Sequence, residues 1–219
     1  MPEIITAKEA AEMIKPNNSV MFGGFLAVGC PENLVDALKE LGTCCIDMIV
    51  ISTDFEDKGV GLLVANKQVS KVQTSHIGTN RASQALMSSG EMEVVLIPQG
   101  TLMERIRSAG AGLGGVLTPT GLGTIVSEGK QILTVQGKEY ILEEPISADF
   151  AFIRAEKADR YGNLVYDKTA RNSNPMMATA ARVTVAEVEE IVEIGEISAE
   201  DVVTPGVFVD YLVVHEEKS

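Results

Sequence analysis

Three glycines near the N-terminus stand where a chain can bind an anion or an oxyanion. Gly23, Gly24 and Gly29 follow the apolar run of residues 19–22, and apolar residues recur at helical spacing after Pro31. This order predicts a strand, a glycine loop and a helix N-terminus, which presents main-chain N–H groups to negative charge. Glycines also let a ligand approach the backbone closely. The alternative interpretation is a tight strand-to-helix turn that binds nothing.

Polar residues follow three further apolar runs, and they are the other candidates for chemistry. Residues 52–54 come after the run 46–51, His76 ends the run 69–75, and Gln99 follows the run 94–97. In a parallel sheet, ligands bind outside the carboxyl ends of the strands, so these positions are expected at one edge with the glycine loop. For His76, a hydrogen-bonded structural role is favoured over acid–base chemistry.

The elements that must position these residues alternate between strand and helix. This alternation predicts an α/β fold: a largely parallel open sheet with helices on both faces. Residues 131–135 and 139–142 alternate around Gln136-Gly137-Lys138, which predicts a small β-hairpin extension. Thr6 with Glu9, and Thr101 with Glu104, have the spacing of capping boxes, the second opening a helix over 102–108. With no internal repeat or linker, residues 1–219 are expected to form a single domain.

Composition excludes several classes of function. The net charge of −13 over 219 residues argues against nucleic acid or an anionic membrane as partner. No apolar run reaches the ~18 residues of a membrane span. Three cysteines, two of them adjacent, are not a disulfide framework and indicate reduced thiols in a cytoplasmic protein. Cys30 lies in the glycine loop, but a nucleophilic role is disfavoured because the chain has only two histidines.

Two other patterns suggest binding sites that their context does not support. Gly110-x-Gly112-x-x-Gly115 has dinucleotide-binding spacing, but a helix precedes it where a strand is required. The run of residues 110–123 is instead expected to be a mobile loop that closes over a ligand or a partner. The glutamates between 187 and 200 are expected to form a solvated face, and no metal site is predicted.

The whole set of motifs resembles one enzyme family. The string Gly23-Gly24-Phe25, three residues, Gly29, one residue, Pro31 resembles the first signature of the class I coenzyme A transferases. Matches continue in order along nearly the whole chain, and the ordered set is more specific than any single motif. It is similar to the alpha subunit of acetate/acetoacetate/butyrate CoA-transferases and to the N-terminal half of succinyl-CoA:3-oxoacid CoA-transferase. The later matches are 59–63, 75–80, 89–94, 98–102, 105–112, Ala170-Arg171-Asn172 and Thr204-Pro205-Gly206.

The resemblance implies a subunit that is inactive alone. Enzymes of this family move CoA between a short-chain acyl-CoA (acetyl-, acetoacetyl- or butyryl-CoA) and a short-chain carboxylate. They work by ping-pong kinetics through a glutamyl-CoA thioester, whose glutamate lies in a Ser-Glu-Asn-Gly motif on the beta subunit. This chain lacks that motif, because Ser127-Glu128-Gly129 is the nearest string and has no Asn. A beta subunit in an α₂β₂ assembly is therefore the expected partner, with CoA as substrate and no cofactor.

Residue roles also follow from the resemblance. It implies that Gly23, Gly24, Phe25, Leu26, Ala27, Val28 and Gly29 form the loop that contacts CoA. Gln99 matches a glutamine that lines the acyl site beside the partner's nucleophile, although it could instead cap its own loop. Arg105 and Arg107 are expected to bind the partner or CoA phosphates, or to be solvated. The acyl group is left open, and the alternative function is a stand-alone sugar-phosphate-binding or isomerase-like module with a similar α/β fold.

Overall fold

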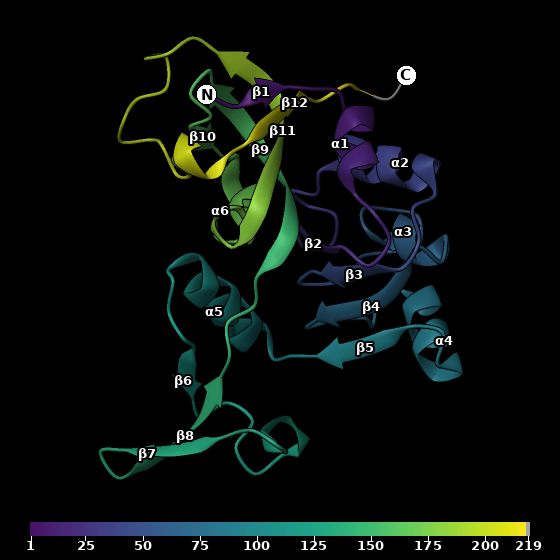
Figure 1. The fold of residues 1–219 in the computed structure, drawn as a ribbon, viewed down its shortest axis with the longest axis vertical. Coiled ribbons are helices and arrows are strands. Elements are labelled where there is room, and N and C mark those ends of the chain that lie inside the picture. Colours follow the sequence, from purple (N-terminus) through teal and green to yellow (C-terminus); the bar gives the residue numbers. More distant parts are fainter. Residues whose placement is uncertain (218–219) are drawn as a thin grey trace.

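A computed structural model describes residues 1–217 of the chain, and a large sheet dominates it (Figure 1). Nine strands within these residues form this sheet, and every neighbouring pair is parallel except β10 with β9. The predicted, largely parallel α/β sheet is confirmed. The strand order is β1 (Glu3–Ile4), β12 (Tyr211–Val214), β11 (Ala181–Val192), β9 (Ala148–Asp159), β2 (Ser19–Phe22), β3 (Ile46–Ile49), β4 (Val69–Thr74) and β5 (Glu93–Leu96), with β10 (Leu164–Val165) beside β9.

Helices cover both faces of the sheet, each over its own apolar core. On one face lie α1 (Ala7–Met13), α2 (Glu32–Leu41), α3 (Gly61–Ala65) and α4 (Arg81–Ser89), whose buried side chains pack with those of β2, β3 and β4. On the other face lie α5 (Gln99–Gly110) and α6 (Asn174–Thr179), packed on β9 and β11. Figure 1 shows the two groups on opposite sides of the strands.

The chain reverses its direction across the sheet between β2 and β9. From β2 the strands proceed outward to β3, β4 and β5, and then the chain returns to place β9 on the other side of β2. From β9 the order continues outward through β11 and β12. Ligands of open α/β sheets bind at such a switch point, outside the carboxyl ends of the strands. The glycine loop that follows β2 lies there.

One of the two predicted capping boxes is present. Thr6 Oγ1 accepts the Glu9 N–H at 3.2 Å, and the Glu9 carboxylate accepts the Thr6 N–H at 2.8 Å. The second prediction was wrong, because α5 begins at Gln99 and places Thr101 inside the helix. The buried Thr101 hydroxyl has no hydrogen-bond partner within residues 1–217. Pro98, which has no N–H to continue the β5 ladder, ends the strand and starts the helix earlier than predicted.

A small antiparallel sheet extends from the main body in Figure 1. The predicted hairpin is confirmed as β7 (Ile132–Val135) and β8 (Lys138–Glu143). A third strand, β6 (Val116–Thr118), pairs with β8, so the expectation of a loop over 110–123 was partly wrong. The buried Glu143 ties this sheet to α5, because it pairs with Arg105 at 3.5 Å and with Lys130 at 2.6 Å.

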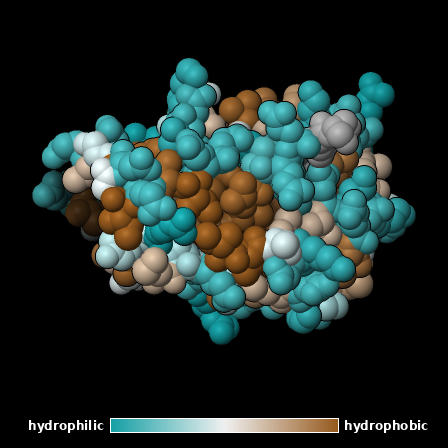
Figure 2. Space-filling view, turned by 90° about the horizontal axis from the view of Figure 1, so that it is seen from above, coloured by the Kyte–Doolittle hydropathy of each residue, from teal (hydrophilic) through white to brown (hydrophobic). Residues whose placement is uncertain are grey.

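The end of the molecule that carries β1 and β12 has an apolar surface. Figure 2 shows hydrophobic side chains gathered in one patch there, with hydrophilic residues around it. Ile4 on the edge strand β1 and Val214 on β12 are about half exposed. No helix within residues 1–217 has the length and apolar character that a membrane span requires.

Candidate functional site

The loop after β2 forms a tight two-residue turn, which we call the glycine turn (residues 23–29). The main chains of Phe25 and Val28 bond to each other in both directions, at 3.1 and 3.0 Å. Leu26 and Ala27, at the tip, both have left-handed backbones, with φ of 51° and 68°. Such a conformation costs about 1–3 kcal/mol for a non-glycine residue and persists only where the surroundings enforce it.

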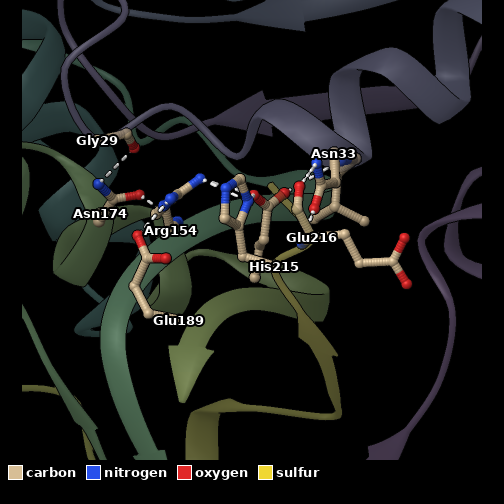
Figure 3. A network of polar contacts seen from close by, with 9 residues as sticks. Gly29, Asn33, Arg154, Asn174, Glu189, His215 and Glu216 are labelled. Carbon is tan, nitrogen blue, oxygen red and sulfur yellow. Dashed lines mark hydrogen bonds and ion pairs between the residues drawn. The ribbon is translucent and has the colours of Figure 1, made fainter. Parts of the chain in front are cut away.

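Two asparagines brace the base of the glycine turn. The Asn172 side chain accepts the Gly24 N–H at 3.1 Å and donates to the Val28 carbonyl at 2.9 Å. Asn174 donates to the Gly29 carbonyl at 3.0 Å and accepts the Arg154 N–H at 2.9 Å (Figure 3). The Ala170-Arg171-Asn172 motif thus has a structural explanation, because it reaches the glycine turn from about 145 residues further along the chain.

This packing explains why the glycines are needed. A Cβ on Gly23 would lie 1.6 Å from Asn174 Oδ1, and one on Gly29 would lie 2.5 Å from the Ala170 carbonyl oxygen. A ligand was predicted to approach these glycines closely. At Gly23 and Gly29, Asn174 and Ala170 of the chain occupy that space instead.

The amide groups expected to receive an anion are largely bonded within the chain. The Gly23 N–H donates to the Phe152 carbonyl at 2.9 Å, and the Leu26 N–H donates to Ser52 Oγ at 3.3 Å. At the α2 N-terminus, the Leu34 N–H donates to the Glu187 carboxylate at 3.1 Å. At these positions the prediction of free N–H groups was wrong, because main-chain and side-chain oxygens from distant parts of the chain accept these donors. Contact with a ligand here falls to the tip of the turn, where Val28 is half exposed.

Two cavities flank the tip of the glycine turn. One, of about 450 Å³, lies between the turn and the part of β9 that extends beyond β2. The other, of about 370 Å³, lies between the turn, the loop after β3, and helices α2 and α3. The glycine turn is therefore open to solvent on both sides. Half of the residues that line the first cavity are charged, namely Glu32, Arg154, Glu156, Asp167 and Glu189. The lining of the second cavity includes apolar Leu26, Val28, Val35, Phe55 and Leu62 as well as Asp57 and Lys58.

A buried charge network lies behind the first cavity, and it makes Glu187 the one exception to the predicted solvated acidic face, whose other glutamates are exposed. The fully buried Glu187 on β11 pairs with Arg154 Nη1 and with His215 Nδ1, each at 2.7 Å. Burial raises the pKa of Glu187, while the Leu34 N–H, Arg154 and His215 oppose that rise. The signal for its burial was the apolar pair Ala186 and Val188 on either side. Glu189, which pairs with the same arginine, is about half exposed as predicted.

The loop after β3 holds a second buried carboxylate. Asp54 accepts Ser52 Oγ–H at 2.7 Å and the Val60 N–H at 3.2 Å, and Ser52 Oγ in turn accepts the Leu26 N–H at 3.3 Å. Burial raises the pKa of Asp54 in spite of these bonds. Residues 52–54 lie at the predicted edge of the sheet, but their burial was not predicted.

The other predicted residues lie apart from the glycine turn. Gln99 is exposed at the start of α5, three strands from β2, which is roughly 14 Å at the usual strand spacing. The main-chain carbonyl of His76 accepts the Thr53 N–H at 3.1 Å, and His76 itself is exposed. Arg107 pairs with Glu104 at 2.7 Å, so neither predicted arginine is free.

Two further groups offer no reactive chemistry. Cys30 is 2% exposed, and burial raises the pKa of its thiol well above the ordinary value, which disfavours the thiolate. Among the described residues, no three His, Cys, Asp or Glu side chains are grouped to hold a metal ion.

Comparison with known proteins gives a match over almost the whole chain. The family model described as "Coenzyme A transferase" matches residues 4–215. The acetate CoA-transferase subunit alpha of Escherichia coli K12 is 49% identical over 98% of both chains. The acetoacetyl-CoA:acetate/butyrate CoA transferase alpha subunit of Clostridium acetobutylicum is 41% identical over 96% of this chain and 97% of its own.

A solved structure shares the fold. An acyl-CoA transferase from Escherichia coli O157:H7, determined as a thioester complex with CoA, superimposes with a TM-score of 0.90 at 22% identity. The superposition covers all of this chain but only 48% of that longer one. At this identity the likeness concerns the fold alone.

Proposed function

This chain belongs to the coenzyme A transferase family, and we propose that it is the alpha subunit of an enzyme that transfers CoA between short-chain acyl groups. The observation that carries the proposal is the 49% identity, along 98% of both chains, to an acetate CoA-transferase alpha subunit. The donors we propose are acetyl-, acetoacetyl- or butyryl-CoA, and the acceptor is a short-chain carboxylate. CoA is a substrate, and no cofactor takes part.

In the proposed reaction a beta subunit supplies the nucleophile. Its glutamate attacks the acyl-CoA carbonyl, the C–S bond breaks, and an acyl-glutamyl anhydride and CoA thiolate form. The thiolate then attacks the glutamyl carbonyl, which releases the donor carboxylate and leaves a glutamyl-CoA thioester. The acceptor carboxylate reverses the two steps, so no electrons are gained or lost. Splitting the transfer in this way replaces one difficult step by easier ones.

In this proposal, the chain contributes the part of the site that binds CoA. The tip of the glycine turn, between two cavities at the switch point of the sheet, supports a role in contacting CoA. Residues Gly23 to Gly29 contact CoA in this proposal, chiefly through the exposed tip. Gln99 faces the acyl group, and its exposure at the same sheet edge leaves its amide available to a shared site. Three free cysteines support a cytoplasmic location.

The test is reconstitution with a co-expressed beta subunit in an α₂β₂ complex. We expect ping-pong kinetics from the pair and no transfer by this chain alone. Borohydride reduction of the CoA-loaded enzyme, followed by mass spectrometry of each chain, should place the trapped glutamate on the beta subunit. Transfer by this chain without its partner, or a trapped glutamate on it, would contradict the proposal.

A further inference from the structure

We propose that Asp54 is a positioning residue that holds the tip of the glycine turn in the shape that receives acyl-CoA. The inference rests on the proposed function, because the effect of Asp54 is to be read in acyl-CoA kinetics. Asp54 belongs to the loop after β3, and neither the family resemblance nor the relatives' names assign it a role.

The glycine turn needs such a residue. Left-handed backbones at two successive positions are the usual requirement of this turn, and they normally call for glycine or asparagine. Leucine and alanine occupy these positions here, at Leu26 and Ala27. Because neither residue favours the conformation, groups outside the turn must hold it in place.

Asp54 makes the bonds that meet this need. Its carboxylate accepts Ser52 Oγ–H at 2.7 Å, and the same Ser52 oxygen accepts the N–H group of the tip residue Leu26 at 3.3 Å. Ser52 and Val60 hold the carboxylate in turn, at 2.7 and 3.2 Å, and the side chain is almost fully buried. Hydrogen bonds to an ionised acceptor are stronger than neutral ones. The bonds from Asn172 reach only the base of the turn, whereas Ser52 contacts the tip and Asp54 holds the Ser52 hydroxyl in place.

The two loops repeat the same geometry side by side. Phe25 pairs with Val28 before Gly29, and Phe55 pairs with Lys58 before Gly59. A Cβ on Gly59 would lie 2.3 Å from Asp54 Oδ2 and 3.2 Å from the Ala27 Cβ, so the loops pack directly on each other.

The cavity of about 370 Å³ lies between these loops, and Leu26, Ala27 and Phe55 line it. Asp54 therefore fixes the distance between two walls of this cavity. A change at Asp54 should alter ligand binding there, in addition to any effect on folding.

A matched control is available at the opposite end of β2. Asp149 accepts the Ser19 N–H at 3.0 Å and Ser19 Oγ–H at 3.1 Å, which ties it to the start of the strand. It lies at the amino end of β2, away from the glycine turn. Asp149→Asn thus weakens a similar carboxylate-to-backbone contact without changing the tip.

The experiment compares Asp54→Asn with Asp149→Asn in the complex with the beta subunit. Asparagine keeps the size of the side chain but replaces one accepting oxygen by an NH₂ donor. We expect KM for acyl-CoA to rise roughly tenfold in Asp54→Asn, the effect of losing one such bond. We expect KM for the acceptor carboxylate to stay the same, and Asp149→Asn to leave both values unchanged.

A second substitution separates positioning from general damage. Ala27→Gly in the Asp54→Asn background lets the tip adopt a left-handed backbone at little cost. Part of the rise in KM for acyl-CoA should then be reversed. If Asp54→Asn does not fold, Ser52→Ala removes the support of the same carboxylate and should raise KM for acyl-CoA in the same direction.

The outcomes are distinguishable. An unchanged KM in Asp54→Asn, an equal rise in Asp149→Asn, or no recovery with Ala27→Gly would overturn the role of Asp54. An inactive wild-type complex would instead count against the proposed function, before any variant is measured.

Discussion

At the residue scale, buried carboxylates join parts of the chain that are far apart in sequence. Glu187 connects α2, β9 and the segment after β12 through Leu34, Arg154 and His215. Asn33 reinforces the last of these contacts, because it exchanges two hydrogen bonds with the main chain of Glu216, at 2.6 and 3.1 Å. The C-terminal segment is thereby fixed beside the helix that follows the glycine turn.

Glu187→Ala should destabilise the chain by about 3–5 kcal/mol, because it leaves Arg154 largely buried without its main partner. Glu189→Ala is the control, since Glu189 pairs with the same guanidinium but is about half exposed. Its cost should stay within about 1 kcal/mol. Urea unfolding of both variants measures the difference, and equal losses of stability would contradict a buried network centred on Glu187.

Thr101→Val should stabilise the chain by about 1 kcal/mol, because it removes a buried hydroxyl that has no partner. Thr6→Val should instead destabilise it by about 1 kcal/mol, through loss of the capping box at α1. The midpoints of urea unfolding should therefore shift in opposite directions in the two variants. A loss of stability in Thr101→Val would favour the capping box predicted at that position.

Asp47→Asn should stabilise the chain in a pH-dependent way. Burial raises the pKa of Asp47 above its ordinary value of 3.8, although Lys71 opposes the rise. A carboxyl with a raised folded-state pKa contributes stability below pH 3.8 that is lost as pH rises through the folded pKa. The amide has no such loss, so the advantage of the variant should grow as pH rises above about 4 and level off above the folded-state pKa of Asp47. A pH-independent difference in the free energy of unfolding would be the contrary result.

At the scale of elements, the glycine turn is defined by its neighbours as much as by its own residues. Gly23→Ala should cost about 1–3 kcal/mol, because its methyl group would overlap Asn174, which is buried and hydrogen bonded. Gly100→Ala is the matched control, since a Cβ there meets nothing within 4 Å and the position is helical. It should gain about 0.5–1 kcal/mol. Thermal unfolding separates the two, and a gain in both would mean that Asn174 moves freely.

Helix α4 shows how an element can be overlooked in sequence. It was not predicted, although Asn80 caps it by accepting the Ser83 N–H at 3.0 Å and Gly90 ends it with φ of 75°. Only Ser83 and Leu86 are buried along its length, so its apolar face is too narrow for a clear helical period. The capping residues were the signal that would have identified it.

At the scale of the whole molecule, the two sheets should differ in local stability. The three strands β6, β7 and β8 are short and expose much of their surface, whereas β2, β3 and β9 are central and buried. Such a small sheet is marginal without packing. We expect the amides of β7 to exchange with deuterium well before those of β2, in native-state hydrogen exchange followed by mass spectrometry. Equal protection in both sheets would show that they unfold as one unit.

Much of the architecture was predictable because it depends on local patterns. Most elements could be located from the apolar runs, from the change between strand and helical period, and from the glycines at turns. The same patterns located the sheet edge that carries the candidate site. The partners of those elements were not predictable in this way. Residue patterns do not show that Asn172 reaches Val28, or that Glu187 takes the Leu34 N–H, because these contacts join residues more than 140 positions apart.

The amino-acid sequence by itself determined the kind of fold, the order of most of its elements, the position of the glycine turn and the family resemblance. Only the tertiary structure decided that β9 returns to lie beside β2, and so which acids are buried and which amides are already bonded. The physical reason is that period and turn chemistry are properties of neighbouring residues. Burial and hydrogen-bond satisfaction instead depend on which distant segments the folded chain brings together.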